Sequence, residues 1–404
     1  MSDLLGFTSI TLVSLIIIFI TIRWPHLSNI LFVALILRVS IILYGHYISP
    51  LPDSTADAKT FENTAWALAQ YGFFHVWDNF TGPHPYFITW LIAIPYSLFG
   101  RSILMAQSIS LFFGMGSIIL GWLLANKLWN KNTANKVGWA IALFPSLILY
   151  SVLILREVYI VFFLLVALYG TVSWVKTDSF KSIILAIIGF IGVTFFHGAL
   201  FVGCIVFLVT IGLSSLKRLL KLLRTFRINF KILIFLSLFL VSTVFYMSNK
   251  ISVPYLGTFE SATNIERLID KTRIATRGDA SWPEWTKINS PNEIYYKAPL
   301  RSIYVVFAPF PWDIKKIKHL IGMFDAFIFI YLSFLIFQNR KHIWRDPALK
   351  IILIILLSYI LVFGIGVGNF GTGIRHRSKF AVMFILLAAP FLKRYTLFKN
   401  IKNL

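Results

Sequence analysis

The sequence predicts an all-α polytopic membrane protein whose helices cross a lipid bilayer about eleven times. Of its 404 residues, 58% are hydrophobic and only 13% are charged, whereas a soluble domain carries about a quarter charged residues. Apolar runs recur along the whole chain, and many approach the roughly 20 residues that a helix needs to cross about 30 Å of hydrocarbon. Because backbone polar groups in lipid must be satisfied within the segment, we expect these runs to be helices.

The predicted spanning helices follow one another along the chain. They cover residues 4–22, 28–48, 103–125, 136–153, 158–175, 182–196, 198–215, 230–248, 319–338, 350–368 and 379–394. The first has no basic region before it and no small-residue cleavage site after it, so we expect a retained helix rather than a signal peptide. The run 182–215 is too long for one span and is interrupted at His197, which indicates a helical hairpin. The apolar stretch 86–100 is too short for a tilted span and contains Pro95, so we interpret it as a re-entrant or surface-lying segment.

Lysine and arginine in short loops predict the orientation of the chain. The net charge is +22, and because much of it lies beside apolar segments, the positive-inside rule explains it without nucleic acid as a partner. Segment 217–227 is the strongest cytoplasmic signal, and its basic face is expected to contact anionic lipid headgroups. Further cytoplasmic signals are Lys127, Lys131, Lys136, Lys176, Lys181, Arg340, Lys341, Arg345 and Lys350. The C-terminus is placed on the same side by Lys393, Arg394, Lys399 and Lys402.

Alternation of the spans then fixes which stretches are extracytoplasmic. These are 49–102, the turn at Arg156-Glu157, the turn at His197, the loop 249–318 and the turn 369–378. The chain divides into an N-terminal transmembrane module (1–248, with the first external loop 49–102), a long external loop (249–318) and a C-terminal transmembrane module (319–404). Prolines in the long loop favour irregular structure. Its candidate sugar-binding residues are Trp282, Trp285 and Arg277, although tryptophan is also typical of the membrane interface.

The first external loop contains the candidate catalytic residues. From residue 58 onward, apolar side chains recur at helical spacing and predict a short helix along the membrane surface. Asp57 stands at the start of this helix, where it either caps the helix or serves as a general base or metal ligand. Asp53 is the second candidate. A hydroxyl acceptor must lose its proton as it attacks a sugar carbon, and a positioned carboxylate can accept that proton.

This loop and the segments after it resemble GT-C-type membrane glycosyltransferases, which include protein O-mannosyltransferases and lipid A aminoarabinose transferases. The resemblance extends to about residue 175, and it rests first on Asp57 after an early transmembrane helix, with the aromatic Phe61 four positions on. The other matching motifs are Pro83-His84-Pro85-Tyr86-Phe87, Leu98-Phe99-Gly100-Arg101-Ser102, Ala142-Leu143-Phe144-Pro145-Ser146, Tyr150-Ser151 and Arg156-Glu157. It implies a GT-C-like architecture in which Asp57, or Asp53, is the base or a metal ligand. The relatives usually have an acidic pair where this chain has Asp57-Ala58, so a divalent metal is possible but not required.

The C-terminal half resembles membrane proteins of bacterial surface-polysaccharide loci, some of which are O-antigen repeat polymerases of the Wzy type. Segments 273–283, 299–304 and 309–313 carry this resemblance. It implies the same class of reaction, with a larger lipid-linked donor.

Four external basic residues are candidates to bind the phosphate of a lipid carrier: Arg156, Arg375, His376 and Arg377. A polyprenyl phosphate or pyrophosphate places its charge at headgroup level, and the planar fork of arginine matches phosphate. We interpret 369–379 as a cationic turn whose glycines let backbone N–H groups approach an anion. The alternatives are an interfacial anchor or a cytoplasmic loop for 375–379, and for Arg156 a salt bridge to Glu157 or a snorkelling side chain.

Three residues within apolar runs have simpler interpretations. Arg38 lies inside the second predicted span, where it requires a polar partner or an aqueous cavity. His197 is expected to form an interhelical hydrogen bond rather than to bind a ligand. Cys204 is the only cysteine, which excludes an intrachain disulfide and a cysteine metal cluster.

Together these features predict a multi-pass glycosyltransferase of the bacterial inner membrane that acts in surface-polysaccharide synthesis. It would take a sugar or oligosaccharide from a polyprenyl-linked donor on the extracytoplasmic side and pass it to a lipid-linked glycan or polysaccharide. The nearest alternative is a repeat polymerase. A lipid-linked oligosaccharide flippase or transporter would instead show internal repeats and ionisable residues in the middle of several helices, and a non-catalytic scaffold is the third possibility.

Overall fold

The computed structural model describes residues 2–80, 82, 86–223, 248, 281–314 and 317–392, and these residues form helices and no β-strand. Six segments are long and apolar enough to cross a membrane. They are α1 (Ser2–Arg23), Pro25–Tyr47 with α2 (Ser28–Tyr47), α6 (Ile103–Leu128), α9 (Glu157–Thr177), Gly198–Leu216 within η2 and α11 (Phe201–Leu223), and α18 (Pro347–Gly366). The prediction of an all-α membrane protein is therefore confirmed, while the count of about eleven spans stays a prediction.

Shorter apolar helices complete the bundle. They are α5 (Phe87–Phe99), α10 (Phe180–Phe196) and the Gly322–Gln338 part of α16 (Ile317–Gln338). With only 13 residues, α5 is too short to cross hydrocarbon, and it packs against α3 (Asp57–Ala69), the short helix predicted from residue 58 onward. The predicted span 230–248 lies outside the described residues except for residue 248.

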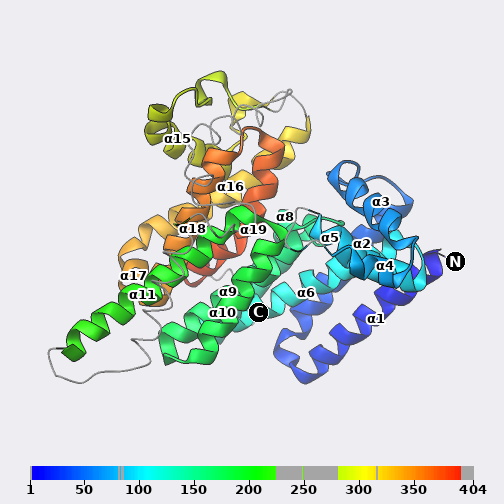
Figure 1. Ribbon diagram of the computed structural model, residues 1–404, viewed down its shortest axis with the longest axis horizontal. Coiled ribbons are helices and arrows are strands. Elements are labelled where there is room, and N and C mark those ends of the chain that lie inside the picture. The colour runs from blue at the N-terminus through cyan, green and yellow to red at the C-terminus, as the bar shows by residue number, and fades with distance from the viewer. Residues whose placement is uncertain are drawn as a thin grey trace, which may run out of the picture.

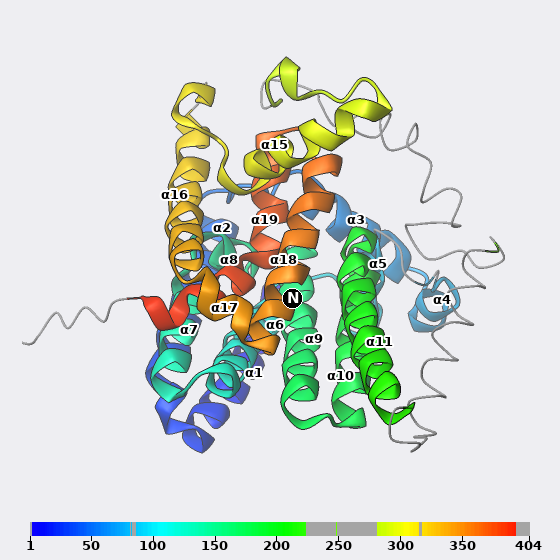
Figure 2. The same ribbon diagram turned by 90° about the vertical axis from the view of Figure 1, so that its left-hand side faces the viewer.

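The helices form two groups joined by a central pair. Figure 1 shows α1, α2, α6 and the short helices α3, α4 (Phe73–Asp78) and α5 on one side, and α15 (Ile294–Phe307), α16 and α18 on the other. Between them lie α9 and α19 (Phe370–Ala388). In Figure 2, α15 lies across one end of the bundle. At this end, which we call the α15 end, α9 and α19 begin and α18 stops.

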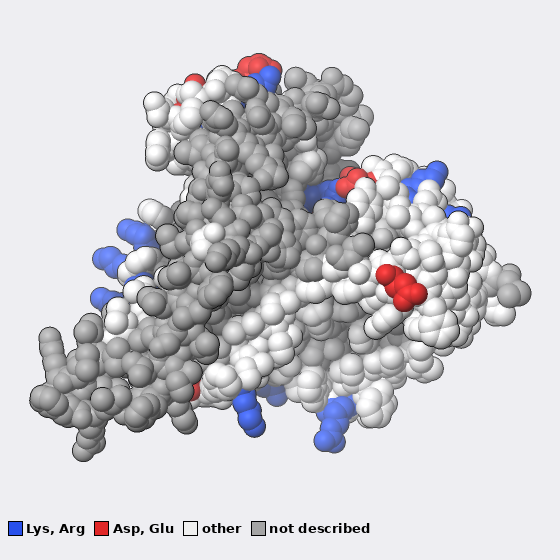
Figure 3. Space-filling model, viewed as in Figure 1, with Lys and Arg blue, Asp and Glu red and all other residues white. Residues whose placement is uncertain are grey.

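Several of the predicted cytoplasmic loops gather at the opposite end, whereas the basic side chains of 217–227 and of 393–402 lie outside the described residues. Lys127 donates a hydrogen bond to Ser173 across the ends of α6 and α9, and the rings of Trp129 and His342 stack at 5.6 Å. Lysine and arginine side chains project from this end in Figure 3. The structure thus places these basic loops together. Which face of the membrane they occupy stays a prediction.

Two predicted boundaries are wrong. Segment 136–153 is not one span but two helices, α7 (Lys131–Leu143) and α8 (Pro145–Tyr150), because Pro145 has no N–H to continue the first. Segment 369–378 is not a turn but the start of α19, where the Asn369 side chain accepts a hydrogen bond from the N–H of Thr372. Its glycines and cations therefore lie within a helix and not in a loop.

Arg38 stabilises the break before Pro145. Its guanidinium is buried and donates to the carbonyls of Ile141 and Ala142, which lack helical partners because α7 ends there. It also donates from Nε to the hydroxyl of Ser151 at 2.8 Å. The partner that an arginine in lipid requires is thus supplied by the end of another helix.

Arg301 likewise donates hydrogen bonds to carbonyls at a helix end, and it attaches the long loop to the bundle. The described part of that loop is largely helical, contrary to the irregular structure expected from its prolines. Arg301 on α15 is fully buried and donates to the carbonyls of Gly364, Ile365 and Val367 at the end of α18. Burial lowers the pKa of Arg301 to about 10. The contact fixes α15 across the end of the bundle.

Replacing Arg38 with methionine should lower the free energy of unfolding by about 3 kcal/mol, because several buried carbonyls would lose their donors. Thermal unfolding in detergent measures this, with Arg23→Met at the exposed end of α1 as the matched control. Equal midpoints for the two variants would contradict this role of Arg38.

Candidate functional site

An arginine links three helices at the α15 end. Arg375 on α19 donates from Nη1 to Oδ2 of Asp57 at 2.6 Å and from Nη2 to Oε1 of Glu157 at 3.3 Å. Asp57 is the first residue of α3, and Glu157 is the first residue of α9. Asp57 and Arg375 are 318 positions apart in the sequence. The structure therefore brings together two of the residues that the sequence predicted for one site.

Glu157 is the buried centre of this cluster. Its side chain is 1% exposed, and the same Oε1 lies 3.6 Å from Nζ of Lys379, which is equally buried. Its other oxygen, Oε2, makes no hydrogen bond with the described residues. The N-terminus of α9 favours a negative charge at this position. Lys379 also contacts Nδ1 of His376 at 2.7 Å. A buried carboxylate thus holds two cations of α19 in place.

From the sequence, Glu157 was expected only to form a salt bridge to Arg156. The only indication of a functional role in the sequence was a pair of charged residues at the boundary of a long apolar run. Many residues at a membrane interface share this feature without having a function.

Arg156 and His197 border the cluster. The guanidinium of Arg156 lies 5.4 Å from the centre of the Phe61 ring on α3, and its charge acts on Glu157 and His197. Burial, together with Lys379 and Arg156, holds the pKa of His197 well below its ordinary value.

His376 faces inward rather than toward an open phosphate site. Its ring stacks on Phe363 at 4.4 Å and meets the ring of His197 edge-on at 5.1 Å. It lies beside Arg375 in the sequence, but its side chain contacts Phe363 of α18, His197 and Lys379. The role of His376 in binding a phosphate therefore stays a prediction.

Arg377 does not belong to the cluster, which corrects the prediction. Two positions along a helix are about 200° apart around its axis, so Arg377 faces away from Arg375. It is fully buried and donates from Nε to Oδ2 of Asp325 on α16 at 2.9 Å. Its other donors bind the carbonyls of Val306, Ala308 and Gly322. Four of its five N–H donors are engaged and the side chain is fully buried on the α16 side of α19, so it is not placed to bind a phosphate beside Arg375.

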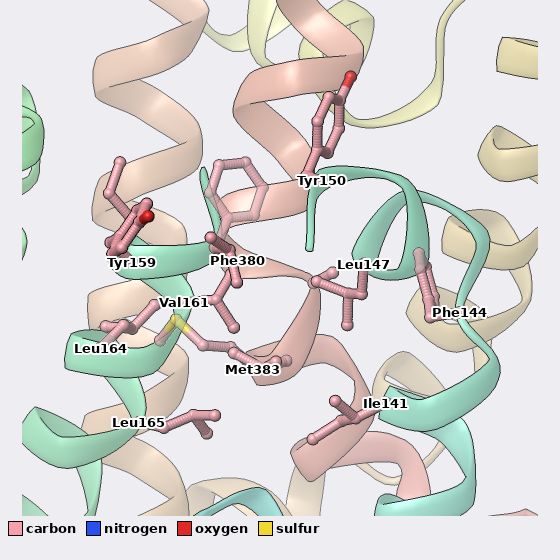
Figure 4. Packing of buried hydrophobic residues seen from close by; sticks show 14 of the residues in the cluster. Ile141, Phe144, Leu147, Tyr150, Tyr159, Val161, Leu164, Leu165, Phe380 and Met383 are labelled. Atoms are coloured by element: carbon pink, nitrogen blue, oxygen red, sulfur yellow. The ribbon is translucent and has the colours of Figure 1, made fainter. Parts of the chain in front are cut away.

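A cavity of about 820 Å³ lies beside the Asp57–Arg375 pair. It is bounded by segment 50–56, α8, α16 and the first turns of α19, and Asp53 lies among its lining residues. The Asp53 backbone has a φ of 63°, a left-handed conformation that aspartate tolerates better than most residues. Tyr150 donates its hydroxyl to Oδ2 of Asp53 at 2.9 Å. Figure 4 shows this hydroxyl pointing away from the apolar cluster in which the ring is packed.

The tryptophans predicted to bind sugar differ in their surroundings. Trp282 is 2% exposed, and Arg301 and Tyr304 cover its ring, so neither face is open to a sugar. Trp285 is 54% exposed and lines a separate pocket of about 380 Å³ together with Trp312. Arg277 lies outside the described residues. Within the described part of the chain, no three His, Cys, Asp or Glu side chains gather as a metal site would need.

Glu157 and Lys379 should be coupled, because removing Glu157 leaves the buried Lys379 ammonium without its counter-charge, whereas removing Lys379 still leaves Glu157 paired with Arg375. In a double-mutant cycle of Glu157→Gln and Lys379→Met, the coupling free energy should be about 1–3 kcal/mol.

The matched control is the exposed pair Glu284 and Lys287, for which about 0–1 kcal/mol is expected. Denaturant unfolding in detergent measures both cycles. Equal coupling in the two pairs would show that Glu157 does not organise the cluster.

Searches of protein-family models, curated proteins and solved structures find no match to this chain. What the cluster and the cavity do must follow from their own residues.

Proposed function

We propose that this protein is a membrane glycosyltransferase that moves a sugar or oligosaccharide from a polyprenyl-phosphate or pyrophosphate carrier to a hydroxyl acceptor. The observation that carries the proposal is the Asp57–Arg375–Glu157 cluster, which lies at the edge of a cavity containing a second carboxylate, Asp53. Transfer of a sugar from a phosphate requires a cation for the leaving group and a base for the acceptor. This edge offers both.

Arg375 is the group best placed to bind the carrier phosphate. Its side chain is 18% exposed, and one of its two partners, Asp57, is itself 51% exposed. A phosphate can replace the Asp57 carboxylate on Nη1 while the buried Glu157 keeps Nη2 in place, since arginine binds phosphate with the same planar fork. Arg156 adds positive charge on the same side of the cluster. Arg377 takes no part, because it is fully buried and faces Asp325 on the other side of α19.

Asp53 is the better placed of the two candidate bases. Asp53 lines the cavity and binds only the Tyr150 hydroxyl among its side-chain contacts in the described structure, whereas Asp57 does not line the cavity. The acceptor oxygen would attack the anomeric carbon of the donor and pass its proton to the Asp53 carboxylate. The bond between that carbon and the phosphate oxygen breaks, and the phosphate leaves with the electron pair, stabilised by Arg375.

The same reaction with a repeat unit as donor would make the protein a polysaccharide repeat polymerase. The proposed location is the bacterial inner membrane, with the α15 end on the extracytoplasmic side. The basic residues at the opposite end support this orientation. The carrier and acceptor are thus proposed to meet at the outer surface of the membrane.

Arg375→Gln should weaken binding of a short-chain polyprenyl phosphate by tenfold or more, since a charge-assisted hydrogen bond contributes about 1.5–3 kcal/mol. Binding to the purified protein in detergent can be followed by tryptophan fluorescence. Arg340→Gln, on the exposed α17 (Arg340–Arg345) at the opposite end, is the control. Unchanged binding by Arg375→Gln would reject the phosphate site.

Asp53→Asn should keep polyprenyl-phosphate binding but lower transfer about a hundredfold or more, because the base is lost. Transfer is measured in membranes that contain the native lipid-linked donors. Asp78→Asn, on the exposed end of α4, is the matched control. Full transfer by Asp53→Asn would show that Asp53 is not the base.

A further inference from the structure

The cavity beside the cluster has a polar floor as well as an acidic mouth. Asp53 and Thr55 stand at the mouth and are exposed, whereas Ser146 and Asp325 lie at the floor and are 5% and 4% exposed. Asp325 gives Oδ2 to Arg377. Ser146 adjoins the same carboxylate without completing a well-formed hydrogen bond, so the Ser146 hydroxyl and Asp325 Oδ1 remain unsatisfied among the described residues.

Unsatisfied buried polar atoms are costly unless a ligand or water completes their hydrogen bonds. Here the groups are carboxylate oxygens and hydroxyls, which accept hydrogen bonds from hydroxyl donors. They line a space of about 820 Å³, within the range of small-molecule sites. The cavity therefore has the polarity to bind a molecule rich in hydroxyl groups.

The charge of the lining argues against an anionic ligand. Among the described residues that line the cavity there is no lysine, arginine or histidine, while Asp53 and Asp325 are both present. The cations of the site lie beyond Asp57, in the Arg375 cluster. The two halves of the site are thus of opposite character: one is suited to a phosphate, and the other to uncharged hydroxyls.

We propose that this cavity is a binding site for an uncharged sugar, held through its hydroxyl groups by Asp53, Tyr150, Ser146 and Asp325. The identification of the ligand as a sugar rests on the proposed function. The apolar rim residue Phe324, which is 63% exposed, offers a face for the carbon skeleton of the ring. Sequence reasoning gave no role to Ser146 or Asp325.

Protection of an introduced thiol tests this proposal without any sugar donor. In a Cys204→Ala background, Thr55→Cys places a thiol at the mouth, and its alkylation by N-ethylmaleimide is followed by mass spectrometry. The probes are glucose, galactose, mannose, rhamnose and N-acetylglucosamine, with glucuronate as the anionic comparison. At least one neutral sugar should slow alkylation about threefold at twice its dissociation constant, and glucuronate should not.

Two glycines provide a matched pair of variants. A Cβ added at Gly371, which lines the cavity, meets nothing nearer than Asn369 Oδ1 at 3.8 Å, and one added at Gly366, which does not line it, meets nothing within 4 Å. Gly371→Leu should fill the cavity and abolish protection, whereas Gly366→Leu should preserve it. Ser146→Ala should weaken protection without removing the Asp325–Arg377 pair.

Several outcomes would overturn the proposal. These are the absence of protection by any neutral sugar, equal protection by glucuronate, equal protection in Gly371→Leu, or equal protection of a thiol at Thr60→Cys, which is exposed on α3 and does not line the cavity. Because protection needs no donor and no turnover, its failure is distinct from a failure of sugar transfer in the Asp53 and Arg375 variants.

Discussion

Helix ends buried in a low-dielectric interior need hydrogen-bond donors, and three arginines supply them. Arg38 donates to the last carbonyls of α7, Arg301 to those of α18, and Arg377 to those of α15. A helix C-terminus presents carbonyls without partners and a partial negative charge, which suits a guanidinium. These contacts hold α8, which borders the cavity, in place after the Pro145 break, and they hold α15 across the end of the bundle.

The candidate site is built around Arg375, an arginine that does not bind the end of a helix. Arg375 differs from the three buried arginines because it binds two carboxylates rather than backbone carbonyls, and one of them is exposed. A ligand anion can replace the Asp57 carboxylate on Arg375. An anion bound to Arg301 or Arg377 would instead remove the hydrogen-bond donors from carbonyls at the end of a helix. The cations lie in the Arg375 cluster, whereas the neighbouring cavity is lined by carboxylates. A phosphate would therefore bind at the cluster and uncharged hydroxyl groups in the cavity.

The sequence predicted the apolar helices, the short helix near Asp57 and one site at which Asp57 meets Arg156, Arg375 and Arg377. Of these three arginines, Arg375 pairs with Asp57. The sequence did not distinguish Arg375 from Arg377, because that difference depends on which face of α19 meets α16 and which meets α9. The sequence also predicted a turn at 369–378, because glycines and cations there are typical of loops. The helix nevertheless begins at this point, where the Asn369 side chain caps it. Glu157 and Asp325 were missed because a single carboxylate in an apolar run carries no periodic signal.

We propose that this protein transfers sugar to a surface glycan, with Arg375 binding the carrier phosphate and Asp53 as the base. The most direct measurement is structural analysis of surface glycans from a strain that lacks the gene. We expect either chains limited to one repeat unit or glycans that lack a single residue, with restoration by the wild-type protein but not by Arg375→Gln. A glycan that is unchanged by the deletion would contradict the account.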